Sequence, residues 1–107
     1  MNIGGMTIDS LGNIIVAGYF RAQYNYGDDT PFIAKISKSG DLTFFTSINI
    51  TFTTFNAIAL DADDGFFAAG QTQTTLDPIQ QIYRFDAILV KFDGNGNLQL
   101  RKTIDSG

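Results

Sequence analysis

The chain contains the same hairpin pattern twice. Residues 85–104 read FDAILVKFDGNGNLQLRKTI, and residues 30–48 read TPFIAKISKSGDLTFFTSI. In both, two extended apolar runs flank a Gly-containing turn, and an offset of 56 residues places Lys35 on Lys91. Self-similarity at a fixed offset indicates that the chain is built from repeated structural units.

A second repeat precedes each hairpin. Residues 5–18, GMTIDSLGNIIVAG, align with residues 57–70, AIALDADDGFFAAG, at an offset of 52 residues. The four-residue difference between the two offsets falls in the segment between the halves, which we therefore interpret as a length-variable loop. Two units of about fifty residues, each made of short β runs, have the period of a β-propeller blade.

Each unit contains four predicted strands, separated by turns rich in Asp, Asn, Ser and Gly. The predicted strands of the first unit are residues 5–9, 13–20, 32–37 and 42–50. Those of the second unit are residues 56–61, 65–72, 86–93 and 97–104. We therefore predict an all-β chain forming one domain, residues 1–107, of two four-stranded antiparallel units, about 3–55 and about 56–107.

The hydrophobic pattern favours propeller blades over a two-sheet sandwich. IIVAGYF (14–20) and AILVKF (87–92) are apolar on nearly consecutive residues, so both sides of each sheet are expected to be covered. A sandwich strand with one wet side would alternate. Only residues 98–101 do so, as the outermost strand of a blade should.

These residues resemble a known group. The succession G-N-I-x-V-A-G-Y, a variable loop, and D-A-x-L-V-K-x-D-x-x-G-N-L-Q-x-x-K-T-I is similar to bacterial β-propeller repeats of the SBBP or delta-60 type. Leu100 departs from that pattern, in which the last strand often has an aromatic such as Phe44. The resemblance implies a propeller fold in secreted or surface proteins, and it implies no particular activity.

Two blades are too few for a closed propeller, which typically has four to eight. The mid-strand residues Ile15, Ile33, Phe67 and Leu89 lie in rows with no polar side, so some of these rows must contact another blade. We expect a head-to-tail homotrimer with six blades. A homotetramer with eight blades, or a fragment of a longer single-chain propeller, are the alternatives.

Composition excludes several functions. The chain has no His, Cys, Trp or Glu, so it lacks a Ser–His–Asp triad, a Cys nucleophile and an ordinary zinc site. A net charge of −4 argues against nucleic-acid binding. No apolar run is long enough for a membrane span, and the N-terminus lacks the features of a signal peptide. We expect a non-enzymatic protein without a cofactor, which either stays inside the cell or belongs to a longer protein.

The expected ligand-binding region is formed by two long segments, residues 19–31 and 71–85, which leave the same end of the blades. Binding residues concentrate on such loops, and tyrosines beside carboxylates and amides suit a sugar or a peptide. The alternative is that the tyrosines only anchor the loops to the rim. The predicted site residues are Tyr24, Tyr26, Asp28, Asp29, Asp77, Gln81, Tyr83 and Arg84.

Two acidic turns raise the possibility of calcium, because spaced Asp and Asn supply hard oxygen ligands. They are DADDG (61–65) and DGNGN (93–97). Neither has the Glu that closes an EF-hand loop, and tight turns use the same residue types, so we predict turns without metal. Asp28 and Asp29 are adjacent, and no second acid is placed to complete a catalytic pair.

Overall fold

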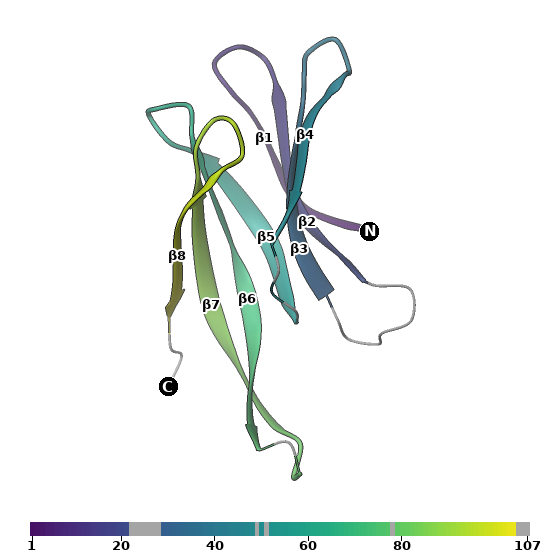
Figure 1. Cartoon of the computed structure of the whole chain (residues 1–107), viewed down its shortest axis with the longest axis vertical. Coiled ribbons are helices and arrows are strands. Elements are labelled where there is room, and N and C mark those ends of the chain that lie inside the picture. Colours follow the sequence, from purple (N-terminus) through teal and green to yellow (C-terminus); the bar gives the residue numbers. More distant parts are fainter. Residues whose placement is uncertain (22–28, 49, 51, 78, 105–107) are drawn as a thin grey trace.

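The computed structural model describes residues 1–21, 29–48, 50, 52–77 and 79–104. Its eight strands form two four-stranded antiparallel sheets, each in simple chain order (Figure 1). The first sheet consists of β1 (Asn2–Ile8), β2 (Ile14–Arg21), β3 (Asp29–Ile36) and β4 (Leu42–Ser47). The second consists of β5 (Thr53–Leu60), β6 (Phe66–Asp77), β7 (Ile82–Phe92) and β8 (Leu98–Ile104). The predicted all-β class and the two four-stranded sheets are confirmed.

The two sheets share one pattern of strand pairing. Ile15 lies opposite Lys35 in the first sheet, and Phe67 lies opposite Lys91 in the second. The register shifts also recur, near the start of β1 and β5 and near the end of β3 and β7. Each paired residue of the first sheet therefore has an equivalent in the second, 52 residues later for β1 and β2 and 56 residues later for β3 and β4.

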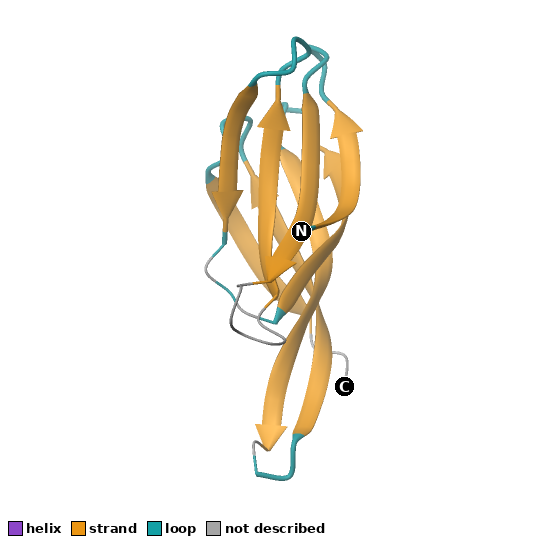
Figure 2. Cartoon of the chain, turned by 90° about the vertical axis from the view of Figure 1, so that its right-hand side faces the viewer, coloured by secondary structure: helices purple, strands orange, loops and turns teal. Residues whose placement is uncertain are grey.

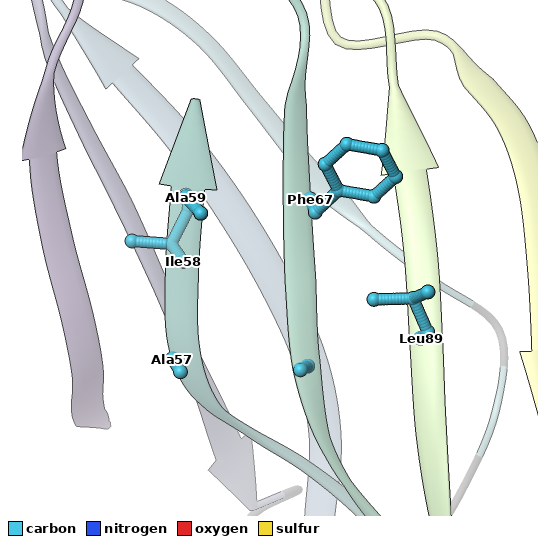
Figure 3. A pocket seen from close by; sticks show the side chains of 6 residues that line it. Ala57, Ile58, Ala59, Phe67 and Leu89 are labelled. Atoms are coloured by element: carbon cyan, nitrogen blue, oxygen red, sulfur yellow. The ribbon is translucent and has the colours of Figure 1, made fainter. Parts of the chain in front are cut away.

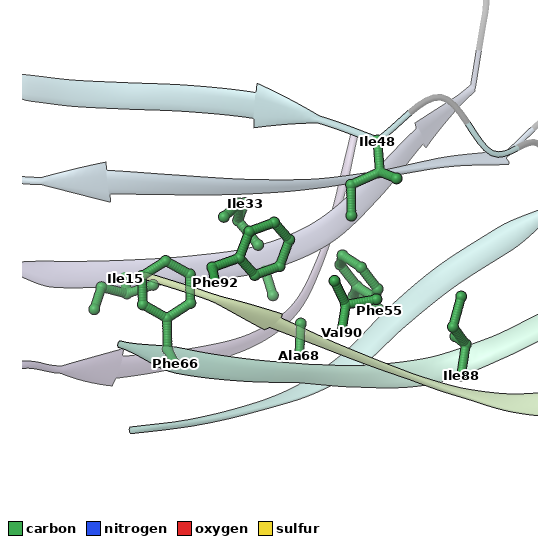
Figure 4. Packing of buried hydrophobic residues seen from close by; sticks show 10 residues of the cluster. Ile15, Ile33, Ile48, Phe55, Phe66, Ala68, Ile88, Val90 and Phe92 are labelled. Atoms are coloured by element: carbon green, nitrogen blue, oxygen red, sulfur yellow. The ribbon is translucent and has the colours of Figure 1, made fainter. Parts of the chain in front are cut away.

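The sheets pack face to face, and alternate residues from their facing sides form the core (Figure 4). The ring of Phe66 stacks on Phe92 with centroids 5.5 Å apart and on Phe44 of the other sheet at 6.2 Å. Burying these side chains supplies the main driving force for folding. The core residues are Ile15, Ala17, Ile33, Ile48, Phe55, Phe66, Ala68, Ile88, Val90 and Phe92.

The sheets approach most closely along β1 and β5, while β8 lies at the far side of the second sheet (Figure 1). A side chain at Gly4 would collide with the carbonyl group of Phe55, and a Cβ on Gly5 would lie 3.2 Å from the backbone nitrogen of Ile58. Glycine permits this backbone-to-backbone contact because it has no Cβ.

The prediction of a long loop over residues 71–85 was wrong. β6 continues to Asp77 and β7 begins at Ile82, so the two strands form a hairpin arm that projects beyond the sheet (Figure 2). The polar run QTQTT predicts a loop, but Thr is β-branched, and pairing with β7 satisfies the backbone of an extended strand. Residues 19–21 and 29–31 of the other predicted loop likewise belong to β2 and β3.

The chain is more open than a compact domain of its length. Its radius of gyration is 14.6 Å, whereas about 13 Å is expected for 107 residues. Its accessible surface is 6539 Å², against about 5,900 Å² for a typical monomer of 11.7 kDa. The described residues include no apolar helix of bilayer-spanning length. The arm and the two uncovered outer sides of the sheets account for the open shape.

Candidate functional site

The side of the second sheet that is turned away from the first, here called outer face 2, is largely apolar. Half-buried Phe67 and Leu89 lie at its centre, and Leu100, which is 49 % exposed, lies toward the edge. Side chains from β5, β6 and β7 leave a shallow apolar hollow of about 160 Å³ (Figure 3). The hollow is lined by Ala57, Ile58, Ala59, Phe67, Ala69 and Leu89.

The corresponding side of the first sheet, outer face 1, is also apolar. Met6 and Ile8 are 63 % and 57 % exposed. Beside them, the ring of Phe45 stacks on Phe32 at 5.0 Å, and Phe20 lies 6.3 Å from each of these rings. Among the described residues, the strand register places no charged side chain on this side. The molecule therefore has two opposite apolar surfaces.

A polar cluster joins the two sheets at the end where the hairpin turns lie. The Asp9 carboxylate accepts hydrogen bonds from the backbone of Leu11 at 3.0 Å and from the backbone and side chain of Asn13 at 2.9 and 3.0 Å. Lys35 Nζ lies 3.4 Å from that carboxylate and donates to the Gly94 carbonyl oxygen of the second sheet at 3.1 Å. Burial alone would raise the pKa of Asp9, but the hydrogen bonds outweigh it and lower this pKa.

An equivalent ion pair lies on outer face 2. Lys91 Nζ is 2.9 Å from Asp61 Oδ2 and 5.5 Å from the centroid of the Phe67 ring. Their hydrogen bond lowers the pKa of Asp61 and raises the pKa of Lys91. Within the described part of the chain, no hydrogen bond gives Lys91 a backbone acceptor equivalent to Gly94. The pair thus repeats the Asp9–Lys35 arrangement without a second sheet against it.

The predicted ligand-binding residues do not all fall in one place. Tyr24, Tyr26 and Asp28 lie outside the described residues. Asp29, in β3, pairs with Arg21 of β2 at 3.3 Å. Arg21 is the last residue of β2 and Asp29 the first of β3, and these ends of the two strands lie away from the tip of the arm formed by β6 and β7 (Figure 1).

The tip of the β6–β7 arm carries two of the predicted residues. The Asp77 carboxylate accepts hydrogen bonds from the backbone N–H groups of Ile79 and Gln80 at 3.0 and 3.2 Å. Gln81 has a φ of +58°, a left-handed conformation that completes the turn. Asp77 therefore forms part of the turn itself.

Two more predicted residues lie along the arm in β7. Arg84 forms a two-point ion pair with the nearly buried Asp86, with N–O distances of 2.8 and 3.2 Å. Tyr83 is 46 % exposed and lies on the same side of the strand as Leu89. The structure thus brings Asp77, Gln81, Tyr83 and Arg84 onto one arm and places Asp29 elsewhere.

In the DGNGN turn, the Asp93 carboxylate is hydrogen-bonded within the turn itself. Asp93 accepts hydrogen bonds from the backbone N–H groups of Asn95 and Asn97, both at 2.9 Å, and from the Asn97 side chain at 3.1 Å. These bonds, that of the Asn97 backbone first, lower the pKa of Asp93. In the described ranges, no group of three or more His, Cys, Asp or Glu side chains is arranged to hold a metal ion.

Sequence reasoning did not find the residues of outer face 1. Met6, Ile8 and Phe45 carry no binding motif, and only the strand register shows that they share a side. Some of the rows of Ile15, Ile33, Phe67 and Leu89 were expected to contact another blade. Ile15 and Ile33 are buried between the chain's own sheets, whereas Phe67 and Leu89 lie on outer face 2. The sequence did contain a signal for these residues. Alternate residues of a strand lie on the same side of its sheet, and comparing this alternation between the two repeats shows which residues share a side.

Comparison with protein-family models and with curated proteins finds no match for this chain. The likeness to propeller repeats therefore stays a resemblance of residues. The described structure offers two opposite apolar faces and one projecting arm as candidate functional surfaces.

Proposed function

We propose that this protein is a non-enzymatic, self-assembling scaffold whose two sheets act as neighbouring blades of a β-propeller. In this proposal three copies associate into a ring of six blades. The observation that carries the proposal is the pair of opposite apolar outer faces, which a solitary two-sheet protein would leave in water. Large exposed apolar patches mark association surfaces in soluble proteins.

Energetics supports association over a solitary chain. Apolar surface removed from water stabilises by about 25 cal/mol per Å², so covering several hundred Å² on each face yields an effect comparable to the whole stability of a small domain. Surfaces on opposite sides produce head-to-tail contacts, and such contacts close into a ring when the rotation between neighbours permits. A four-chain ring and a longer single-chain propeller use the same faces.

Light scattering on the purified chain tests this function. The expected result is a closed oligomer of three chains whose mass barely changes on dilution, since a ring leaves no open end. Leu89→Asp places a charge on outer face 2 and is expected to dissociate the oligomer, whereas Ile79→Asp, at a 92 % exposed site on the arm, leaves it intact. A wild-type chain that stays a folded monomer at high concentration contradicts the proposal.

Glycan binding on the arm is the second candidate function. Tyr83 and Phe85 are alternate residues of β7, so their exposed rings lie on the same side of the arm. Aromatic rings of this kind suit the apolar face of a sugar. A glycan array checks this candidate with a variant in which residues 75–83 are replaced by Asn-Gly. Capture by the wild type and its loss in the shortened variant would support it, and no capture at multivalent density would exclude it.

A further inference from the structure

The interface inside the chain is a template for the contact between chains. Because the two sheets share one register, the outer side of the second sheet is equivalent to the inner side of the first. By the same equivalence, the outer side of the first sheet corresponds to the inner side of the second. The chain therefore presents on its outside the two surfaces that it already packs together inside.

The side chains on outer face 2 match their inner equivalents in kind. Ile15, Ala17, Ile33 and Phe44 on the inner side of the first sheet correspond to Phe67, Ala69, Leu89 and Leu100. Each set has one small residue among three large apolar ones. The total side-chain volume of the two sets is nearly equal. The inner set has its phenylalanine at position 44, and the outer set has its phenylalanine, Phe67, at the position equivalent to Ile15. Conserved volume and pattern are what packing tolerates best.

Outer face 1 matches in the same way. The inner residues Phe66, Ala68, Ile88, Val90 and Phe92 correspond to Ile14, Val16, Phe32, Ala34 and Ile36. Two positions lose an aromatic ring, from Phe66 to Ile14 and from Phe92 to Ile36, and one gains a ring, from Ile88 to Phe32. The apolar pattern of the two inner sides, which the structure shows packed together, thus recurs on the two outer faces, where Phe32 and Ala34 of outer face 1 are already buried within the single chain.

One half of the polar contact between the two sheets is also present on outer face 2. Lys35 pairs with Asp9 and reaches across to the carbonyl of Gly94. Lys91 pairs with Asp61 in the same manner, and the position equivalent to Gly94 is Lys38 in the β3–β4 turn. A second copy seated in the same register would offer its Lys38 carbonyl oxygen to the Lys91 ammonium, a backbone acceptor that the described residues of the single chain do not supply.

The β3–β4 and β7–β8 turns have glycine at equivalent positions, Gly40 and Gly96. A Cβ on Gly96 would lie 2.8 Å from the ring of Phe44, so the absence of a side chain there admits the aromatic ring. Its equivalent, Gly40, has nothing within 4 Å of the corresponding point. In the template register, the second copy's Gly40 receives Leu100. Two positions differ, since β5 has Asn56 and Ala57 where β1 has Gly4 and Gly5, so β5 and the second copy's β1 must stand further apart in the new contact than β1 and β5 do.

We propose that outer face 2 of one copy binds outer face 1 of a second copy in the register of the internal interface, with Lys91 donating to the second copy's Lys38 carbonyl. This inference rests on the proposed scaffold function and adds to its head-to-tail contact the register and the hydrogen bond from Lys91. It excludes a two-fold contact in which identical faces meet, because the template joins unlike faces.

Blocking one face at a time tests the polarity. Met6→Asp charges outer face 1 and Leu89→Asp charges outer face 2, while Ile79→Asp is the matched control. Each blocked variant alone is expected to be a monomer by light scattering. An equimolar mixture of the two is expected to form a dimer of two 11.7 kDa chains, since one intact face 1 then meets one intact face 2. Circular dichroism is the check that each variant is folded.

The outcomes separate this inference from the proposed function. A monomeric wild type defeats both. An oligomeric wild type whose single variants still form dimers, with no added association on mixing, retains the scaffold and overturns the head-to-tail polarity.

Cross-linking tests the register without relying on folded variants. The four lysines of the wild-type chain are Lys35, Lys38, Lys91 and Lys102. A short amine-reactive reagent is added to a mixture of unlabelled and heavy-nitrogen-labelled chains, and the linked peptides are identified by mass spectrometry. Mixed-isotope links between Lys91 and Lys38 are expected. Mixed-isotope links only between identical lysines, or none involving Lys38, would overturn the register.

Discussion

At the scale of single residues, Asp9 supports the contact between the two sheets through Lys35. Its side chain is almost fully buried, and it holds Lys35 in position to reach Gly94. Asp93 makes the same three hydrogen bonds within its own turn, but no ion pair of the described residues involves it. Substituting Asp93 therefore removes only hydrogen bonds within a turn, whereas substituting Asp9 also affects the contact between the sheets.

We predict that Asp9→Ala destabilises the protein by about 2–4 kcal/mol, since it leaves part-buried N–H donors without an acceptor and removes the carboxylate beside the Lys35 ammonium. Asp93→Ala, which removes only the turn bonds, is expected to cost about 1 kcal/mol. Urea unfolding followed by circular dichroism measures both. Equal losses would show that Lys35 contributes nothing through Asp9.

The same residue sets a pH dependence. Because the pKa of Asp9 is lowered in the folded state, its stabilisation is present in full above the ordinary Asp value of about 3.9 and is lost as the pH falls through the folded-state value. The difference in stability between wild type and Asp9→Ala should therefore shrink below about pH 4. A difference that stays constant down to pH 2 would contradict this assignment.

At the scale of elements, glycines decide where neighbouring strands can bulge. Gly18 and Gly70 occupy equivalent positions beside the bulges of β1 and β5. A Cβ on either would collide with a backbone carbonyl oxygen of the adjacent strand, that of Asn2 or Thr54. The close approach involves backbone atoms, so side-chain rearrangement cannot relieve it.

We predict that Gly70→Ala lowers the free energy of unfolding by about 1–3 kcal/mol through this overpacking. Asn56→Ala, an exposed change in the adjacent strand, should stay within about 0.5 kcal/mol of the wild type. Thermal melting compares the two. Adding Thr54→Ala to the Gly70 variant should bring no recovery, because the colliding atom is the backbone oxygen; a recovery would place the clash in the side chain.

The hairpin turns yield a prediction about metal. The Asp93 carboxylate already accepts three hydrogen bonds from its own turn, so a calcium ion would have to compete with these donors for the same two oxygens. Excess calcium or EDTA should therefore leave the melting temperature unchanged. A calcium-dependent rise would reveal a site that binds only the folded state, because such binding stabilises by mass action.

At the scale of the whole molecule, the single chain has a closed core between its sheets and two uncovered outer sides. If the outer sides are covered by other copies, unfolding and dissociation are linked. We predict that the midpoint of urea unfolding rises with protein concentration across about a hundredfold range, as measured by circular dichroism. An oligomer whose midpoint does not depend on concentration would show that its chains unfold without first separating.

The sequence by itself indicated eight strands in two repeated four-stranded units, because the turn residues separate the strands and the two offsets show which strands are equivalent. Interactions within each unit were sufficient for these features. Gly40 and Gly96 both adopt a positive φ in equivalent turns, and Lys35 and Lys91 each pair with a carboxylate of their own sheet.

Only the tertiary structure decided which side of each sheet is inside. A nearly continuous apolar strand such as residues 14–20 offers two similar sides, and the choice depends on packing against a sheet more than fifty residues away. The arm was hidden for a related reason, since pairing with β7 overrides the loop preference of a polar run. The repeat period and the pairing of neighbouring strands depend on residues that are close in the sequence. The burial of a side chain depends on which distant part of the chain packs against it.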